Sequence, residues 1–173
     1  MLTTIRRRQL LKSGAAFGLM GLAAPSLVRA SGDPIVIAHL TPRTGFLGPM
    51  GEYAVMAADL AVEHVNAAGG IGGRTLSLIK EDSVNPQTAT TKAERMAENP
   101  DVSMIIGEIS SASALSISQV AARANKLFIN TGANSDTLRG KDCSRTMFHT
   151  EAQNVMYVNA EGQFFLQNGM VKD

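Results

Sequence analysis

The sequence predicts an α/β fold in which a doubly wound parallel sheet carries helices on both faces. Short apolar segments alternate with longer segments of helical periodicity along most of the chain. The first apolar segment, IVIAHL at 35–40, is almost continuous, which is typical of a strand buried on both faces of a parallel sheet. Alternating strands and helices form right-handed crossover units, so this order indicates a parallel sheet.

The first strand is expected at 35–40 and is followed by a loop, TPRTGFLGPM, that contains glycine and proline breakers. A helix is expected at 51–68, where small apolar residues recur every three or four positions, and Gly69 and Gly70 end it. A second strand is expected at 74–80, which makes GGIGGR, at 69–74, a helix-to-strand turn. The stripe of this helix that is expected to be buried consists of Ala54, Ala57, Ala58, Ala61 and Val65.

The second half of the chain repeats the pattern. Asn85 and Pro86 begin a helix, because asparagine is a good N-cap and proline is tolerated at the first helical position. Strands are expected at 102–106 and 127–129, a helix at 111–123, an extended segment at 147–149 and a last helix at 151–168. The buried stripe of the helix after Pro86 is expected to be Ala89, Ala93, Met96 and Ala97.

The first 30 residues have the features of a secretory signal: three arginines, a moderately apolar stretch and a small-residue cleavage site at VRA, 28–30. Arg7-Arg8, two leucines and a lysine resemble a twin-arginine signal, and an ordinary signal with arginines is the alternative. These residues hold five of the 16 basic residues and none of the 15 acidic ones. The remaining 11 basic and 15 acidic residues give a net charge of −4, which provides no nucleic-acid footprint.

Three serines, Ser110, Ser111 and Ser113, follow the expected strand at 102–106, at the edge where parallel sheets hold their ligands. The sequence does not favour a nucleophile elbow, because no glycine follows these serines and no acid–histidine pair can be assigned. The spacing of Gly132 and Gly140 does not match a phosphate loop, and GGIGGR follows a helix where a dinucleotide loop follows a strand. No metal-ligand spacing is visible. Hydroxyls, glycines and backbone amides of this kind bind a small polar group, and the sequence indicates neither a cofactor nor catalysis.

Four motifs in order carry a family resemblance: TGFLGPMG, AVEHVNAAGGIGGRTLSLIKEDS, IIGEISSASA and LFINTGANSDTLRG. The chain resembles the amino-terminal half of a periplasmic substrate-binding protein of the leucine/isoleucine/valine-binding type, which has the type I periplasmic-binding fold. Such proteins deliver small ligands to the permease subunits of ABC importers and are not enzymes. The resemblance covers Ile35 to about Lys172.

The resemblance also implies a ligand site. Ser111 is at the position of the serine that holds the ligand, and Gly132 and Ala133 are at the positions of small residues whose backbone atoms take part. Asn134 and Met50 stand where branched-chain amino acid binders resemble one another in having threonine and an aromatic residue. Helix capping, turn formation or packing is the alternative role of these residues, and Asp82 and Glu108 are expected to be solvated or structural. The expected ligand-binding set is Ser111, Gly132, Ala133, Asn134, Met50, Phe46 and Ser110.

After the signal expected at 1–30, the same resemblance implies that 31–148 are the first lobe and that 149–173 are a hinge crossing and the first helix of a second lobe that the sequence does not complete. The expected protein is periplasmic, contacts the membrane only through the permease, and binds an amino acid of the branched-chain type. Amides, urea or small aromatic acids are alternative ligands. A sensor ectodomain and an exported α/β enzyme are alternative classes. Cys143, the single cysteine, is either free or paired beyond residue 173.

Overall fold

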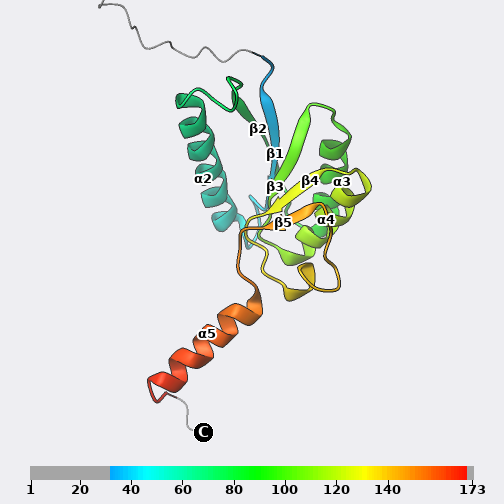
Figure 1. Ribbon diagram of the computed structural model, residues 1–173. Coiled ribbons are helices and arrows are strands. Elements are labelled where there is room, and N and C mark those ends of the chain that lie inside the picture. The colour runs from blue at the N-terminus through cyan, green and yellow to red at the C-terminus, as the bar shows by residue number, and fades with distance from the viewer. Residues whose placement is uncertain (1–31, 171–173) are drawn as a thin grey trace, which may run out of the picture.

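The computed structural model describes residues 32–170 and confirms the α/β fold (Figure 1). Five parallel strands form one sheet in the order β2-β1-β3-β4-β5, so the strand order reverses beside β1, where such sheets hold ligands. The signal predicted at 1–30 lies outside the described residues. The strands are β1 (Ile35–Thr41), β2 (Leu76–Asp82), β3 (Val102–Gly107), β4 (Leu127–Asn130) and β5 (Met147–His149).

Helices cover both faces of the sheet, as predicted (Figure 1). On one face, α2 (Gly48–Ala67) packs on β1 and β2. On the other, α3 (Pro86–Glu98) and α4 (Ser111–Arg123) pack against each other and on the strands, and a short 3-10 turn, η1 (Asp136–Leu138), follows β4. The last helix, α5 (Asn154–Gln167), extends away from the sheet, and none of its residues is buried.

The main core lies between the sheet and the pair α3–α4. The side chain of Asn85 caps α3 by accepting from the Thr88 amide at 2.9 Å, and Pro86 is the first helical residue, as predicted. The predicted stripe of α3 is buried, which confirms its periodicity. Burying each large apolar side chain here stabilises the fold by about 1.5–3 kcal/mol. The largest of these core side chains are Phe128, Leu40, Ile105, Ile117 and Leu138.

Four predicted boundaries were wrong by two or three residues, and one of them is the end of β2, at Asp82 instead of Lys80. Helix α2 begins at Gly48 instead of Gly51, since a proline is tolerated in its first turn. Strand β2 begins at Leu76 instead of Arg74, because Arg74 pairs with Ile71 inside the GGIGGR turn. That turn needs glycine: a Cβ on Gly70 would lie 2.0 Å from the carbonyl oxygen of Arg74. Helix α5 begins three residues later than predicted because the residue before it is extended.

The predicted buried stripe of α2 was also partly wrong. The residues of α2 that are buried are Gly48, Gly51 and Val55, whereas Ala57 and Ala61 are exposed. The helix is rotated toward Gly51, where a Cβ would lie 1.6 Å from the carbonyl oxygen of Pro42. Periodicity gave the correct helix, but a glycine contact decided which side faces the sheet.

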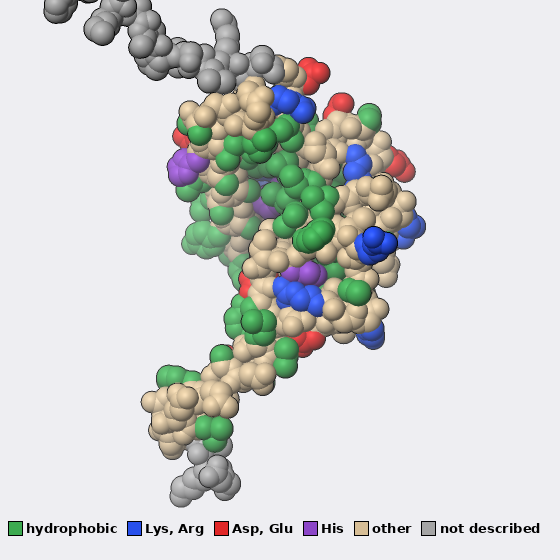
Figure 2. Space-filling model, in the orientation of Figure 1, with side chains coloured by type: hydrophobic (Ala, Val, Ile, Leu, Met, Phe, Trp, Pro, Cys, Tyr) green, Lys and Arg blue, Asp and Glu red, His purple; other side chains and the backbone are tan. Residues whose placement is uncertain are grey.

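Helix α2 covers only part of its face of the sheet. The strand register places further apolar side chains on this face, beside Ile37 and His39, and they are half-buried or exposed. Figure 2 shows hydrophobic side chains gathered over the centre of this view. The apolar side chains of this open face are Met104, Ile106, Leu127, Ile129 and Phe148.

Within residues 32–170, no helix is both long and apolar enough to cross a membrane.

Candidate functional site

The loops that carry the predicted ligand residues meet at one edge of the sheet. The register pairs Thr41 with Asp82, Leu40 with Gly107, and Gly107 with Asn130, so the carboxyl ends of four neighbouring strands lie side by side. The segments that leave these ends are 42–47, 83–85, 108–110 and 131–135. The topology therefore gathers these loops, although they are spread over more than 90 positions of sequence.

Ser110 and Ser111 have different roles at the start of α4. Ser110 is the N-cap, and its hydroxyl accepts from the amide of Ser113 at 3.4 Å. Ser111 is the first helical residue and its hydroxyl accepts from the amide of Ser135 at 3.3 Å. Capping, the alternative role considered for Ser111, therefore belongs to Ser110.

The Ser111 hydroxyl keeps its proton available for a further hydrogen bond. A serine hydroxyl has one proton and two lone pairs, and here one lone pair is used by the amide of Ser135. The first amides of a helix have no intrahelical acceptor, which leaves those of Ser111 and Ala112 available. The helix dipole adds positive potential at this end. A small anionic group would meet one hydroxyl and two amides here.

Asn130 shapes the turn that carries Gly132 and Ala133, and the sequence reading did not single it out. This buried side chain accepts from the Ala133 amide at 3.0 Å and donates to the Ala133 carbonyl at 2.5 Å. Its amide nitrogen also lies 2.9 Å from Nδ1 of His149 on β5. Its position at the end of β4, before Thr-Gly, is the only sequence signal that could have indicated this role. Ala133 is fully buried, and its amide is used inside the protein.

Asn134 is half-buried in the same loop, and its carbonyl accepts from the amide of Asn154 at 2.9 Å. The amide of Val155 donates to the carboxylate of Asp136 at 3.2 Å. The start of α5 is thus attached directly to the loop that carries three of the predicted ligand residues. Gly132, in turn, lies close to the segment that follows β3: a Cβ there would be 3.2 Å from the carbonyl oxygen of Glu108.

Glu108 is completely buried, which corrects the expectation that it could be solvated. One carboxyl oxygen, Oε1, accepts from the amides of Ile109 and Ser110 at 2.9 and 2.8 Å. The other, Oε2, forms a short hydrogen bond with the hydroxyl of Ser83. Burial raises the pKa of Glu108 above its ordinary value, and the hydrogen bonds from Ser83 and from the two amides oppose that shift without cancelling it.

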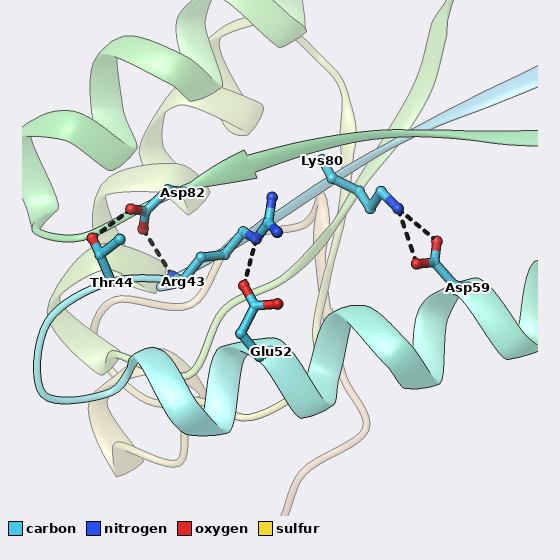
Figure 3. A network of polar contacts seen from close by, with 6 residues as sticks. All are labelled: Arg43, Thr44, Glu52, Asp59, Lys80 and Asp82. Atoms are coloured by element: carbon cyan, nitrogen blue, oxygen red, sulfur yellow. Dashed lines mark hydrogen bonds and ion pairs between the residues drawn. The ribbon is translucent and has the colours of Figure 1, made fainter.

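Asp82 fixes the loop after β1 (Figure 3). Its carboxylate accepts from the amide of Arg43 at 2.8 Å and from the hydroxyl of Thr44 at 2.5 Å. Burial acts to raise the pKa of Asp82, but the hydrogen bonds from Thr44 and Arg43 outweigh it, so that the pKa is lowered. On α2, Glu52 pairs with Arg43 at 2.8 Å and Asp59 pairs with Lys80 at 2.9 Å.

The loop after β1 presents an exposed aromatic ring. Phe46 is 99% exposed and borders a hollow of about 260 Å³ with Ser110 at the carboxyl ends of β1 and β2. Met50, on the first turn of α2, is 56% exposed and does not line this hollow. The structure therefore brings Phe46 close to the α4 terminus and leaves Met50 apart. The other lining residues are Pro42, Thr44, Leu47, Ser83, Val84, Asn85 and Pro86.

The histidines of the described chain do not form a metal site. Residues 32–170 contain no group of three or more His, Cys, Asp or Glu side chains that could hold a metal ion. His39 is buried on β1, and burial lowers its pKa; its Nδ1 has no hydrogen-bond partner within the described residues. Cys143 is exposed, away from the sheet edge described above.

An α/β fold with hydroxyls, small residues and helix amides at its switch point is typical of modules that bind a small polar ligand. Comparison with known proteins is consistent with this class. The sequence profile of the family described as "Periplasmic binding protein" matches residues 34–172. The chain belongs to the periplasmic binding protein family, whose members bind solutes and are not enzymes.

One similar protein is the "Leu/Ile/Val-binding protein homolog 8" of Brucella suis biovar 1, which is 34% identical over 128 residues. The match covers 74% of this chain and 31% of that protein, so the chain spans about a third of the relative's length.

Two solved structures show the same fold. The substrate-binding protein of a branched-chain amino acid transporter from Streptococcus pneumoniae, in complex with isoleucine, superposes with a TM-score of 0.65 and 25% identity over 69% of this chain and 34% of its own. A solute-binding protein of an ABC transporter from R. palustris, in complex with benzoate, has a TM-score of 0.71 and 24% identity over 79% of this chain and 38% of its own.

Proposed function

We propose that this chain is the ligand-binding part of an extracytoplasmic solute-binding protein that delivers a small carboxylate ligand to an ABC importer. The observation that carries this proposal is the Ser111 hydroxyl, held by the amide of Ser135 beside the free first-turn amides of α4. Such donors match the oxygens of a carboxylate. The family description, periplasmic binding protein, implies a location outside the cytoplasm. Export through the twin-arginine route by residues 1–30 stays a prediction.

An amino acid of the branched-chain type is the ligand we favour. The curated relative is named for Leu, Ile and Val, and one structural neighbour holds isoleucine. A small aromatic acid is the second candidate, because another neighbour holds benzoate and the exposed ring of Phe46 borders the hollow next to Ser110. Both ligands share the carboxylate, so the role of Ser111 is the same in either case.

The remaining predicted residues would surround the rest of the ligand. Asn134 and Gly132 lie in the loop that contacts Ser111 through Ser135, and Phe46 lies across the hollow. We assign residues 31–148 to one lobe and α5 to a second, with closure by a hinge between them. The hydrogen bond between Asn154 and the Asn134 carbonyl would then connect the ligand loop directly to the hinge segment.

A chimera tests this function, with residues 34–172 replacing the matching segment of the Brucella suis relative. Isothermal titration with isoleucine, leucine, benzoate and urea should show saturable binding of a carboxylate ligand and none of urea. The unmodified relative is the control for folding and for its own ligand preference. Binding of urea alone, or of no ligand in a folded chimera, would overturn the proposal.

A further inference from the structure

Glu108 combines two features that rarely occur together. It is a fully buried carboxyl group, and its backbone has a φ of 99°, a region that side chains other than glycine seldom adopt. Gly107, just before it, has a φ of 122°, and a Cβ there would lie 2.1 Å from the Leu40 carbonyl oxygen. Backbone strain of this kind persists only where surrounding contacts enforce it, and it concentrates at functional sites.

Glu108 and Ser110 accept hydrogen bonds from the backbone amides around the start of α4. Oε1 of Glu108 accepts hydrogen bonds from the amides of Ile109 and Ser110, and the Ser110 hydroxyl accepts one from the amide of Ser113. The amides of Ser111 and Ala112 are left. Both amides belong to the first turn of α4, which begins at Ser111, so they lie at the same helix terminus as the Ser111 hydroxyl.

Glu108 also links three of the loops at the sheet edge. Through Oε2 it contacts the hydroxyl of Ser83, which follows Asp82, the residue that holds Arg43 and Thr44. Its carbonyl oxygen lies against Gly132. Glu108 thereby connects the loop of Phe46 with the start of α4 through its side chain, and it contacts the turn of Gly132 through its backbone carbonyl.

We propose that Glu108 is a positioning residue of the ligand site: its carboxyl group occupies the Ile109 and Ser110 amides and so aims Ser111 and Ala112 at the ligand carboxylate. The proposal deepens the proposed function and rests on it. Glu108 itself does not touch the ligand. It acts through the backbone of the turn that it holds.

The first test needs no ligand. Amide hydrogen exchange of the whole chain should show Ile109 and Ser110 protected and Ser111 and Ala112 exchanging rapidly. Glu108→Gly tolerates the positive φ and removes only the side chain, so protection at Ile109 and Ser110 should be lost while core amides such as that of Ile117 stay protected. Unchanged protection at Ile109 and Ser110 in a folded variant would overturn the proposal.

The second test measures binding. In amide NMR titrations with isoleucine and with benzoate, Glu108→Gly should raise Kd about tenfold, since lost hydrogen bonds to a charged group have effects of this size. Glu108→Gln keeps an acceptor for the two amides and should stay within about threefold of the original chain. A purely structural role would lower the melting temperature and leave the ligand-induced shifts of Ser111 and the Kd unchanged.

Two further comparisons keep these outcomes separable. If Glu108→Gly does not fold, Ser83→Ala removes only the contact to Oε2 and should still raise Kd about threefold; an unchanged Kd would then count against the proposal. If the original chain binds neither ligand, the proposed function fails, and the exchange experiment still decides whether Glu108 holds the turn.

Discussion

The hydroxyl of Ser111 lies 3.3 Å from the backbone amide of Ser135 and accepts a hydrogen bond from it. This contact joins the start of α4 to the loop after β4, and these are the two segments that carry most of the predicted ligand residues. It also leaves the hydroxyl proton free to point outward. Ser111 is therefore the residue on which the proposed binding role depends.

Replacing Ser111 by alanine in the chimera should weaken ligand binding about 10- to 150-fold, because a hydrogen bond to a charged group is worth about 1.5–3 kcal/mol. Isothermal titration measures the change. Ser116→Ala is the matched control, since Ser116 lies on the same helix and its hydroxyl donates to the carbonyl of Ala112 at 3.3 Å, its one side-chain hydrogen bond within residues 32–170. An equal loss in both variants, or none in Ser111→Ala, would assign Ser111 a purely structural role.

Asn130→Ala should lower the free energy of unfolding by about 2–3 kcal/mol, because it leaves the buried amide and carbonyl of Ala133 without their partner. Urea unfolding followed by circular dichroism measures this loss. Asn168→Ala, at an exposed position after α5, should change stability by less than about 0.5 kcal/mol. A neutral Asn130→Ala variant would mean that the turn of Gly132 does not need this side chain.

The buried carboxyl of Glu108 should give the protein a stability that falls as the pH rises. Burial raises its pKa in the folded state above the value of 4.5 expected when unfolded. The folded state therefore binds the proton more tightly, and its contribution is complete below pH 4.5 and lost as the pH rises through the folded-state pKa. Because a glutamine side chain cannot ionise, Glu108→Gln should gain stability relative to the original chain from acidic to neutral pH. Denaturant unfolding at several pH values tests this. If the difference in unfolding free energy between Glu108→Gln and the original chain stays constant or decreases as the pH rises, the result would be inconsistent with the raised pKa.

Gly51→Ala should destabilise the protein by at least about 3 kcal/mol and displace the loop of Phe46, because the new Cβ would lie 1.6 Å from the Pro42 carbonyl oxygen. Gly162→Ala, on the exposed helix α5, adds a Cβ with no neighbour within 4 Å and favours the helix. Thermal unfolding should show a large loss for the first variant and no loss for the second. Equal melting temperatures would place α2 differently from the structure.

Much of the fold was predictable from local patterns. The Asn85-Pro86 start of α3, its buried stripe and the order of strands and helices follow from capping and periodicity, and the structure confirms them. The rotation of α2 was not predictable, because it depends on a contact between Gly51 and Pro42 that the periodicity of an alanine-rich helix does not encode. The predicted boundaries were wrong where a turn, such as the one that contains Arg74, extends into the expected strand.

The sequence predicted where the candidate site lies, but it did not predict which residues hold the loops of the site in place. Serines that follow a strand indicate the edge of the sheet where a ligand binds. The topology brings Ser111 next to the loop that contains Asn134. Asn130 and Glu108 act on the backbone of neighbouring loops, and such contacts depend on tertiary distances that a sequence pattern does not contain. A glutamate after Gly107 looks solvated in sequence because its burial results from three loops meeting around it.

Binding of a small carboxylate at the start of α4 can be measured by an amide NMR titration of the chain with isoleucine and with benzoate. One lobe, as we propose for residues 31–148, would enclose one side of the ligand, so millimolar concentrations are appropriate. We expect saturable shifts centred on the amides of Ser111, Ala112 and Ser135, which Ser111→Ala abolishes. Saturable shifts elsewhere, or shifts at these amides that persist in Ser111→Ala, would contradict a carboxylate site at this helix terminus.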